Sequence, residues 1–413
     1  MLRSMFSAIS GLRAHQTKMD VTGNNIANVN TVGYKASQTV FEDTLSQVIR
    51  AGGAPAADRG GTNPAQVGLG VKVAATTTNW TQGATQSTGR STDFMIEGDG
   101  FFIVEGPGGE QLYTRAGSFD FDGSGRLVTP DGSILYGWMA DANGEVNPNG
   151  PIERLSVPYG QTVAPRETTR GGLGGNLPSE LPIGESVTTA TTMYDAQGVA
   201  HEVGYVFTKD AADTWTMTLE VDGAPIAVTP AGPGNVTFAA DGTLSSGPTI
   251  QFSPGLPGWA GPVDVDLAGI AQYGSGNTVT ASTKGIDPID LGFGMGSLQS
   301  FQLGNDGTIT GVYSNGLRQP LGKLALASFN NPGGLEKAGN SSFRVGDNSG
   351  VANIGQAGLG GRGVLNSGAL EMSNVDLAEE FTGLIVAQRG FQANSRVITS
   401  SDEILQDLVN LKR

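Results

Sequence analysis

The segment VTGNNIANVNTVGYK, residues 21–35, places four asparagines directly after a stretch with helical apolar spacing. Asn favours helix caps and turns over helix interiors, because its short amide competes for nearby backbone groups. One interpretation is therefore a helix that ends at Gly23 and is followed by a loop. The spacing of the residues upstream tests this interpretation.

The first residues of the chain follow a seven-residue repeat. Apolar positions alternate steps of three and four, which is typical of a helix with one contact stripe; they are Leu2, Met5, Ile9, Leu12, Gln16 and Met19, continued by Gly23, Ile26 and Asn30. We predict a helix that ends between Asn30 and Gly33. Its opposite side carries Asn24, Asn25 and Asn28, whose amides need partners, and we expect these amides to bond to neighbouring subunits. The loop after Gly23 remains an alternative.

The end of the chain repeats the pattern without a break. The stripe runs through Leu377, Phe381, Leu384, Gln388, Phe391, Ser395, Ile398, Asp402, Leu405 and Val409. Ser373 with Asp376 reads as a capping box at its start. Ser400 with Glu403 fits the same pattern, so a second, short helix is an alternative. Polar stripe positions such as Gln16, Gln388, Ser395 and Asp402 cost stability but fix register and partner number, which favours an assembly over a plain helix pair that closes a globular protein.

Composition limits the class of protein. The chain has 413 residues with 38% hydrophobic residues, 64 Gly and 20 Pro, which suits two or three turn-rich β domains. Its formal charge of -15 argues against nucleic acid or an anionic membrane as a partner. Because the chain has no apolar run long enough to span a bilayer, we also expect no membrane insertion. Cysteine is absent, so thiolate chemistry and disulfides are excluded. The amphipathic start does not resemble a cleaved signal, so we expect a cytoplasmic protein or one exported without cleavage.

Between the two ends the period changes to two, with Gly, Asn and Asp turns. Segments such as DFMIEGDGFFIVEG (93–106) and LQSFQLGNDGTITGVYSNG (298–316) predict antiparallel hairpins. We predict a fold that is mainly β with α-helical termini, arranged as nested discontinuous domains whose end helices pair in a coiled-coil-like layer, with the β domains outside. Gly- and Pro-rich interruptions set the predicted domains: 1–35 with 370–413 helical, 36–70 with 355–369 connector, 71–144 with 286–354 inner β, and 145–285 inserted outer β.

Chemistry is sparse in the sequence. The two histidines, His15 and His201, lie far apart, so neither a metal cluster nor a catalytic triad is predicted. DFDGSGRLVTPD (120–131) matches several positions of a calcium loop but lacks its closing Glu, and a hairpin turn explains it. GLGGRG (358–363) matches a dinucleotide motif without the strand and helix that motif needs. We predict no catalytic, cofactor or metal site.

Three segments resemble one known family. SGLRAHQTKMDVTGNNIANVNTVGYK (10–35) is similar to the amino-terminal segment of bacterial flagellar rod and hook proteins. LEMSNVDLAEEFTGLIVAQRGFQANSRVITSSDEILQDLVNLK (370–412) resembles their carboxy-terminal segment, and TRAGSFDFDGSGRLVTPDGSILYGW (114–138) a shared strand motif. The resemblance implies packed inner layers for Asn24, Asn25, Ile26, Asn28, Gly33, Tyr34, Ser373, Asn374, Val375, Asp376, Gln388, Arg389 and Phe391.

The resemblance also implies a mechanical function. Family members differ in what lies between the shared ends, and the long 145–285 insertion favours the hook type over the distal rod type. Such subunits stack helically into a flexible tube outside the cell that transmits motor torque to the filament. The implied partners are further copies, the flagellar rod, hook cap, hook–filament junction proteins and the export apparatus, with passage through the flagellar channel.

Two alternatives from other classes remain. An extracellular β-rich binding protein or adhesin would explain the strands and the acidity, but not the paired heptad ends. An acid-acting hydrolase would need a carboxylate pair, and no pair stands out by spacing.

Overall fold

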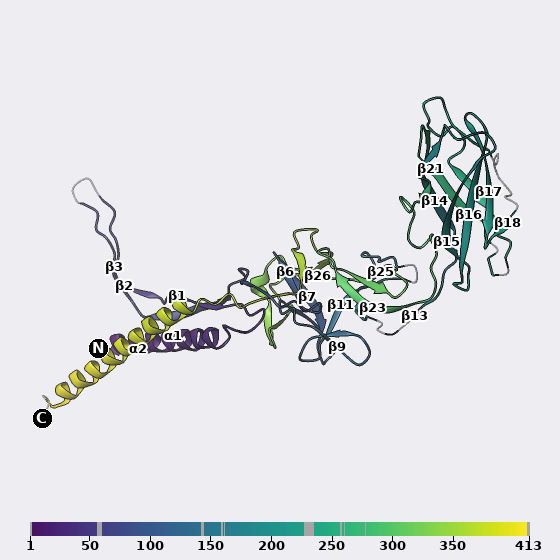
Figure 1. Ribbon diagram of the computed structural model, residues 1–413. Helices are drawn as coiled ribbons and strands as arrows, with labels where there is room; N and C mark the ends of the chain where they lie inside the picture. The colour runs from purple at the N-terminus through teal and green to yellow at the C-terminus, as the bar shows by residue number, and fades with distance from the viewer. Residues whose placement is uncertain are drawn as a thin grey trace.

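The computed structural model describes residues 2–55, 60–141, 144–157, 160, 162–226, 235–256, 258–259, 261–276 and 278–410. The molecule is elongated, with two paired helices at one end, a β region in the middle and a second β body at the far end (Figure 1). Both termini lie at the helical end. The predicted class, mainly β with helical termini, is confirmed. Within the described residues, none of the helices has the length and apolar character needed to cross a membrane.

The end helices, α1 (Leu2–Ala27) and α2 (Leu377–Asn410), pack antiparallel. Gly11 faces Asn394 and Gly390 faces His15 so closely that an added Cβ would lie 2.8 Å and 2.5 Å from these side chains. Small residues therefore set the distance between the helices.

The predicted end of the first helix is wrong by one turn. The α-helix ends at Ala27, and residues 28–30 form turns. The amide of Asn28 donates to the carbonyl of Asn24 at 2.9 Å and its oxygen accepts from the Thr31 hydroxyl at 3.0 Å. This side-chain competition with the backbone is the reason the helix ends before Asn30.

The cap of α2 also differs from the prediction. Asp376, not Ser373, is the capping residue, because its Oδ1 accepts from the backbone N–H of Ala378 at 2.8 Å and of Glu379 at 3.3 Å. The Ser373 hydroxyl accepts only from Val375 N, at 3.4 Å. Asp376 lies immediately before the helix, where a cap side chain reaches the free N–H groups directly. The prediction of one unbroken helix is confirmed, since α2 is continuous, and the alternative of a second, short helix at Ser400 is excluded.

Two-stranded ribbons connect the helices to the sheets. The hairpin of β2 and β3 extends away from the helix pair (Figure 1). The pairs are β1 (Ser37–Asp43) with β4 (Val71–Thr78), β2 (Ser46–Arg50) with β3 (Ala65–Gly68), β5 (Thr85–Ser87) with β31 (Ala369–Glu371) and β6 (Phe94–Glu97) with β30 (Val364–Ser367). The hairpin predicted for 93–106 is therefore wrong, because β6 pairs with β30 and not with the strand that follows it. Gly98 and Gly100, both with positive φ, turn the chain out of the first strand.

The middle region is one large antiparallel sheet of fourteen strands among the described residues. The hairpin predicted at 298–316 is confirmed as β23 and β24. The strands are β7 (Phe101–Glu105), β8 (Gln111–Thr114), β9 (Asp120–Phe121), β10 (Leu127–Val128), β11 (Ile134–Met139), β12 (Glu153–Arg154), β13 (Thr162–Val163), β23 (Gly296–Leu303), β24 (Thr308–Tyr313), β25 (Arg318–Leu324), β26 (Leu326–Ser328), β27 (Glu336–Gly339), β28 (Ser342–Arg344) and β29 (Asn353–Gly355), with a 3-10 turn at Pro332–Gly334.

The far body has two sheets with a core of its own. Trp215, Trp259 and Tyr205 are fully buried between them, and its core cluster shares no member with the core of the middle sheet. One sheet holds β14 (Arg170–Pro178), β20 (Thr249–Phe252), β21 (Val263–Tyr273) and β22 (Thr280–Ala281). The other holds β15 (Ser186–Tyr194), β16 (Ala200–Ala211), β17 (Thr214–Val221), β18 (Ala224–Ile226) and β19 (Asn235–Thr237).

Two predicted domain boundaries differ from the strand pairing. The insertion was expected to begin at 145, but β12 pairs with β11 and β13 with β23, so both strands extend the middle sheet. The inner β domain was expected to begin at 71, but β4 pairs with β1 beside α1. Gly- and Pro-rich composition marks turns, and turns occur inside domains as well as between them.

Candidate subunit interface and the junction that supports it

A buried ion pair joins the two ends of the chain. Lys35 Nζ lies 2.6 Å from Glu371 Oε1, with side-chain exposures of 0% and 1%. Lys35 also donates to Thr81 O at 2.8 Å, and Gly83 N donates to the same carboxylate oxygen at 2.9 Å. Burial lowers the pKa of Lys35, while the adjacent Glu371 carboxylate acts in the opposite direction.

Arg115 adds a third charge to this pair. Its Nη1 lies 3.6 Å from Glu371 Oε2 and donates to Gly98 O at 2.8 Å. Burial lowers the pKa of Arg115 as well. Lys35, Arg115 and Glu371 come from the three segments that carry the family resemblance, so this triad is where those segments meet. A buried ionic group contributes geometry more than stability, because its desolvation offsets most of the attraction.

These three residues lie within the segments that carry the family resemblance, but no pattern in the sequence singles them out. Each is a charged side chain among small and apolar neighbours, as in TRAG (114–117) and ALEMSN (369–374). This pattern indicates that a charged residue is buried, but it does not indicate which charged residues form ion pairs with one another.

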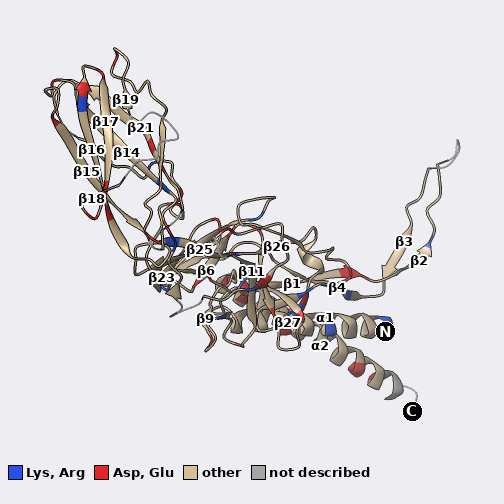
Figure 2. Cartoon of the chain, turned by 90° about the vertical axis from the view of Figure 1, so that its right-hand side faces the viewer, with Lys and Arg blue, Asp and Glu red and all other residues tan. Residues whose placement is uncertain are grey.

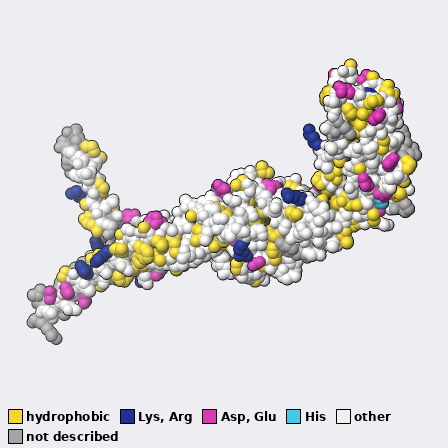
Figure 3. All heavy atoms as spheres, viewed as in Figure 1, with side chains coloured by type: hydrophobic (Ala, Val, Ile, Leu, Met, Phe, Trp, Pro, Cys, Tyr) yellow, Lys and Arg dark blue, Asp and Glu magenta, His cyan; other side chains and the backbone are white. Residues whose placement is uncertain are grey.

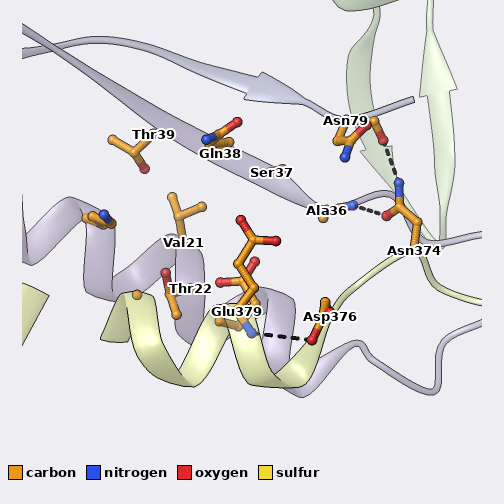
Figure 4. A pocket seen from close by; sticks show the side chains of 13 residues that line it. Val21, Thr22, Ala36, Ser37, Gln38, Thr39, Asn79, Asn374, Asp376 and Glu379 are labelled. Atoms are coloured by element: carbon orange, nitrogen blue, oxygen red, sulfur yellow. Dashed lines mark hydrogen bonds between the residues drawn. The ribbon is translucent and has the colours of Figure 1, made fainter. Parts of the chain in front are cut away.

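Gly33 and Asn374 fix the backbone around the triad. Gly33 has φ +67°, donates its N–H to Glu371 O at 2.8 Å, and approaches Ala116 N so closely that a Cβ would lie 2.5 Å from it. Asn374 Oδ1 accepts from Ala36 N at 2.8 Å, while its Nδ2 donates to Asn79 O at 2.9 Å. Figure 4 shows the Asn374 amide between these two backbone segments.

The amides of the opening stretch bond within their own chain. Asn25 is 1% exposed; its Nδ2 donates to Ser37 O at 2.8 Å and to Glu380 Oε1 at 2.6 Å, and its Oδ1 accepts from Ser37 N at 3.0 Å. Tyr34 donates its hydroxyl to the same oxygen at 3.1 Å and accepts from Asn24 Nδ2 at 3.0 Å. The expectation that these amides bond to neighbouring subunits is therefore wrong for Asn25. Its amide instead links α1 to β1 and α2.

A small polar pocket lies beside this link, between α1, β1 and the start of α2 (Figure 4). It measures about 170 Å³, and Lys18, Thr39, Asp376 and Glu379 are among its lining residues. Asp376 is engaged in capping α2. Among the described residues, no three His, Cys, Asp or Glu side chains gather as a metal site would require. The pocket belongs to the helix–ribbon junction.

The helix pair uses only part of the stripe predicted on α2. Ala387 and Ser401 are buried, and Asn394 contacts Gly11, whereas Gln388, Ser395 and Asp402 are exposed. The predicted polar stripe positions are therefore wrong by one residue, because small side chains, not large apolar ones, form the close contact. On α1, too, the buried positions are small residues, Ala8, Gly11 and Ala14, while the predicted polar stripe position Gln16 is exposed.

The large apolar residues predicted for the stripes lie beside this contact. The half-buried ones are Met5, Ile9, Leu12, Met19, Ile26, Val375, Leu384, Phe391, Ile398 and Leu405. Leu377 and Phe381 are exposed, as are Asn24 and Arg389, and Ser373 and Asn28 are half-buried. The side chains of Leu2 and Val409 lie outside the described residues.

Exposed apolar side chains remain on both helices. Phe6 is 63% exposed, Phe381 50%, Ile385 57%, Val386 55% and Ile404 51%. Figure 3 shows hydrophobic side chains along the helical end of the molecule. A surface of this kind is typical of a protein–protein contact.

The remaining singled-out residues have local structural contacts. The His15 ring packs edge-on against Phe41 at 5.7 Å, and His201 lies between Asp195 and Asp222 in the far body. In the 120–131 loop, Asp122 Oδ1 accepts from Ser124 N and Arg126 N at 2.8 Å and 2.9 Å, so this carboxylate shapes the turn. Residues 358–363 form turns before β30.

Four protein-family profiles match successive parts of the chain. They are described as flagella basal body rod protein (residues 5–35), flagellar hook protein FlgE/F/G D1 domain (95–163), flagellar basal body protein FlaE D2 domain (182–285) and flagellar basal body rod FlgEFG protein C-terminal (366–411). The chain is 42% identical to the flagellar hook protein FlgE of Borreliella burgdorferi and 39% identical to that of Treponema pallidum, over the full length of both chains in each case. It is 34% identical over the full length of both chains to the basal-body rod protein FlgG of Bacillus subtilis.

The fold and these matches define an axial protein of the bacterial flagellum, which lies outside the cell. Within that class, the chain belongs to the flagellar hook protein family, and it is a structural subunit of the hook.

Proposed function

We propose that the chain polymerises helically with further copies into a flexible tube that acts as a universal joint and passes motor torque to the filament. The exposed apolar side chains of α1 and α2 carry the proposal, because a soluble monomer gains nothing from Phe6 or Ile385 in water. A contact between different surfaces of successive copies does not close, and it generates an open helical polymer.

In this proposal the helices line the tube and the β bodies lie outside. The proposed division is 1–35 with 370–413 for the helical layer, 36–70 with 355–369 for the connector, 71–144 with 286–354 for the inner β layer and 145–285 for the outer one. Strand pairing adjusts two of these boundaries: β12 and β13 join the inner β layer, and β4 joins the connector. The buried triad and Asn25 hold the helices on the inner β region within each copy. Bending then needs outer bodies that slide while the inner layer holds.

The proposal includes partners and excludes catalysis. The partners are the flagellar rod, hook cap, hook–filament junction proteins and export apparatus, with export through the flagellar channel. The charged groups described above form turns, caps and ion pairs, and we propose no reaction and no cofactor. Figure 2 shows acidic and basic residues scattered along the chain in the β bodies, in keeping with outer contacts that are shallow and polar.

Electron microscopy of the purified chain tests the proposal. We expect short curved tubes of one diameter, and restored motility when the chain is expressed in hook-deficient cells. A chain that stays monomeric at all concentrations and restores no motility would contradict it.

A stiff, rod-type tube is the alternative to a flexible one, because the chain is also similar over its full length to the rod protein of Bacillus subtilis. Straight, stiff tubes in place of curved ones would support this alternative.

A further inference from the structure

An apolar groove lies on α1 where the β1–β4 ribbon crosses it. It measures about 430 Å³; Phe6, Ile9 and Arg13 line it from the helix, and Val71, Lys72 and Val73 from the ribbon. Val71 N donates to the Ser10 hydroxyl at 3.2 Å, which fixes the ribbon on the helix. At about 100° per residue, Phe6 and Arg13 lie on the opposite side of α1 from Gly11 and His15, which face α2. The chain's own α2 therefore does not cover the groove.

The last turns of α2 extend beyond α1. Gly11 lies opposite Asn394, and His15 lies opposite Gly390. In this antiparallel register, each residue toward the start of α1 corresponds to one residue toward the end of α2. Leu2, the first residue of α1, therefore lies opposite Glu403. The seven residues 404–410 are thus helical without a helix partner in their own chain, over about 10 Å. Figure 1 shows this end projecting past the amino terminus.

The residues that would meet in such a contact carry opposite charges. Asp402, Glu403 and Asp407 are the charged residues of the helical segment 401–410, and Lys412 and Arg413 follow it in the sequence. The first seventeen residues carry Arg3 and Arg13 and no carboxylate. Figure 3 shows acidic side chains near the outer end of α2 and basic ones where the helices meet the ribbon.

The projecting end also has an apolar residue for the groove. Asp407 follows Glu403 by four residues and Ile404 by three, so the three side chains share one side of the helix. Ile404 is 51% exposed. Arg13 has no carboxylate partner among the described residues, whereas Lys72 pairs with Glu42 at 2.5 Å.

We propose that the projecting end of α2 in one copy docks in the α1–β4 groove of the next copy, with Ile404 in the groove and Glu403 or Asp407 paired with Arg13. The inference rests on the proposed helical polymer and names one of its contacts. Donor and acceptor are different surfaces of the same chain, so the contact propagates without closing.

Cysteine crosslinking tests the contact, since the natural chain has no cysteine. Val73→Cys in one chain and Ile404→Cys in a second, affinity-tagged chain are co-assembled in hook-deficient cells, and isolated tubes are oxidised. We expect a tagged–untagged covalent dimer from tubes and none from the same mixture kept monomeric. Ile385→Cys is the matched control on α2, because its exposure of 57% is similar but it lies on a different side of the helix; with Val73→Cys it should give no dimer.

The outcomes separate the contact from the polymer. Intact tubes without the Val73–Ile404 dimer would overturn the docking contact and leave the hook function standing. Absence of tubes from the natural chain would overturn both. Where Val73→Cys prevents assembly, Lys72→Cys with Glu403→Cys repeats the test at exposed positions with the same expected dimer.

A charge exchange gives an independent readout. Arg13→Glu should raise the protein concentration needed for tube formation by about tenfold, because like charges then meet in the contact. Adding Asp407→Lys or Glu403→Lys to that chain should restore most of the loss. Equal assembly of Arg13→Glu and the natural chain would count against the pairing.

Discussion

At the scale of single residues, the buried triad shows why charged side chains persist inside the junction. Glu371 faces two cations, Lys35 at 2.6 Å and Arg115 at 3.6 Å, and all three are almost fully buried. Removing the carboxylate would leave two buried cations without a counter-charge. This costs far more stability than replacing all three charged side chains by apolar ones.

Glu371→Ala should therefore destabilise the chain by about 3 to 5 kcal/mol in urea unfolding followed by circular dichroism. Glu42→Ala is the matched control, because Glu42 also pairs with a lysine, Lys72, but on the surface. It should leave the unfolding midpoint unchanged, since solvent screens exposed pairs. Similar midpoints for both variants would show that the triad is not a structural centre.

His201 is a second residue with a definite electrostatic role. Its Nδ1 lies 2.7 Å from Asp222 Oδ2 and its Nε2 3.5 Å from Asp195 Oδ2, and its ring stacks on Trp259. The hydrogen bond to Asp222, and then the nearby Asp195 carboxylate, raises the pKa of His201 above its ordinary value, against the effect of burial. Because the folded pKa is the higher one, the stabilisation is complete below about pH 6.5 and is lost as pH rises through the folded pKa.

His201→Gln should accordingly lower the melting temperature of the outer body most at pH 6 and least at pH 8.5. Differential scanning calorimetry across this range measures the difference from the natural chain. A difference that is constant with pH would mean that the imidazole contributes packing alone.

At the scale of elements, the helices show what spacing predicts and what it leaves out. The seven-residue repeat correctly predicted two long helices that pair. It assigned the helix–helix contact to Gln388 and Ser395, whereas Ala387 and Asn394 occupy it. Apolar residues mark the surfaces that another copy covers as well as the surface that is covered within one chain, so the pattern does not separate the two. Small residues are weak signals in a hydrophobic pattern, yet they decide how closely two helices approach.

The strands show the same limit. Turn residues predicted hairpins, and the hairpin of β23 and β24 is correct because its strands are adjacent in sequence. The pairing of β6 with β30 joins Phe94 to Ser367, and no local signal encodes a partner that distant. The triad was missed for that reason too, since Lys35 and Glu371 come together only once the ends of the chain have met.

Gly33 and Gly23 make a matched pair for testing this end of α1. Gly33 has φ +67° and no room for a Cβ beside Ala116, whereas Gly23 is helical and open. Gly33→Ala should destabilise the chain by more than about 1 to 2 kcal/mol, because it combines a left-handed backbone with steric overlap. Gly23→Ala should stabilise it by about 0.5 to 1 kcal/mol through helix propensity. Thermal melts of both variants measure the contrast, and equal shifts would contradict the close approach at Ala116.

At the scale of the whole molecule, the outer body is separable from the rest by its contacts. Its core cluster lies entirely between residues 173 and 279, whereas the core of the middle sheet uses residues 94–157 and 293–365. Two connections alone join them in sequence, and they meet at Arg166 and Phe293. These two residues exchange both backbone hydrogen bonds at 3.0 Å. Two residues that are hydrogen-bonded in this way can be joined by a two-residue hairpin turn.

Replacing residues 167–292 by Asn-Gly should thus give a shorter chain that folds and still polymerises. The turn closes an existing hydrogen-bonded pair, so the middle sheet, the triad and the helices keep every contact described above. We expect one cooperative melting transition in place of two, and thinner tubes in electron microscopy, because the surfaces assigned to assembly lie on α1, α2 and the β1–β4 ribbon. Motility should be impaired, since the sliding outer contacts are gone. An excised chain that folds, as judged by circular dichroism, but forms no tubes would show that the outer body, and not the helix pair, drives assembly.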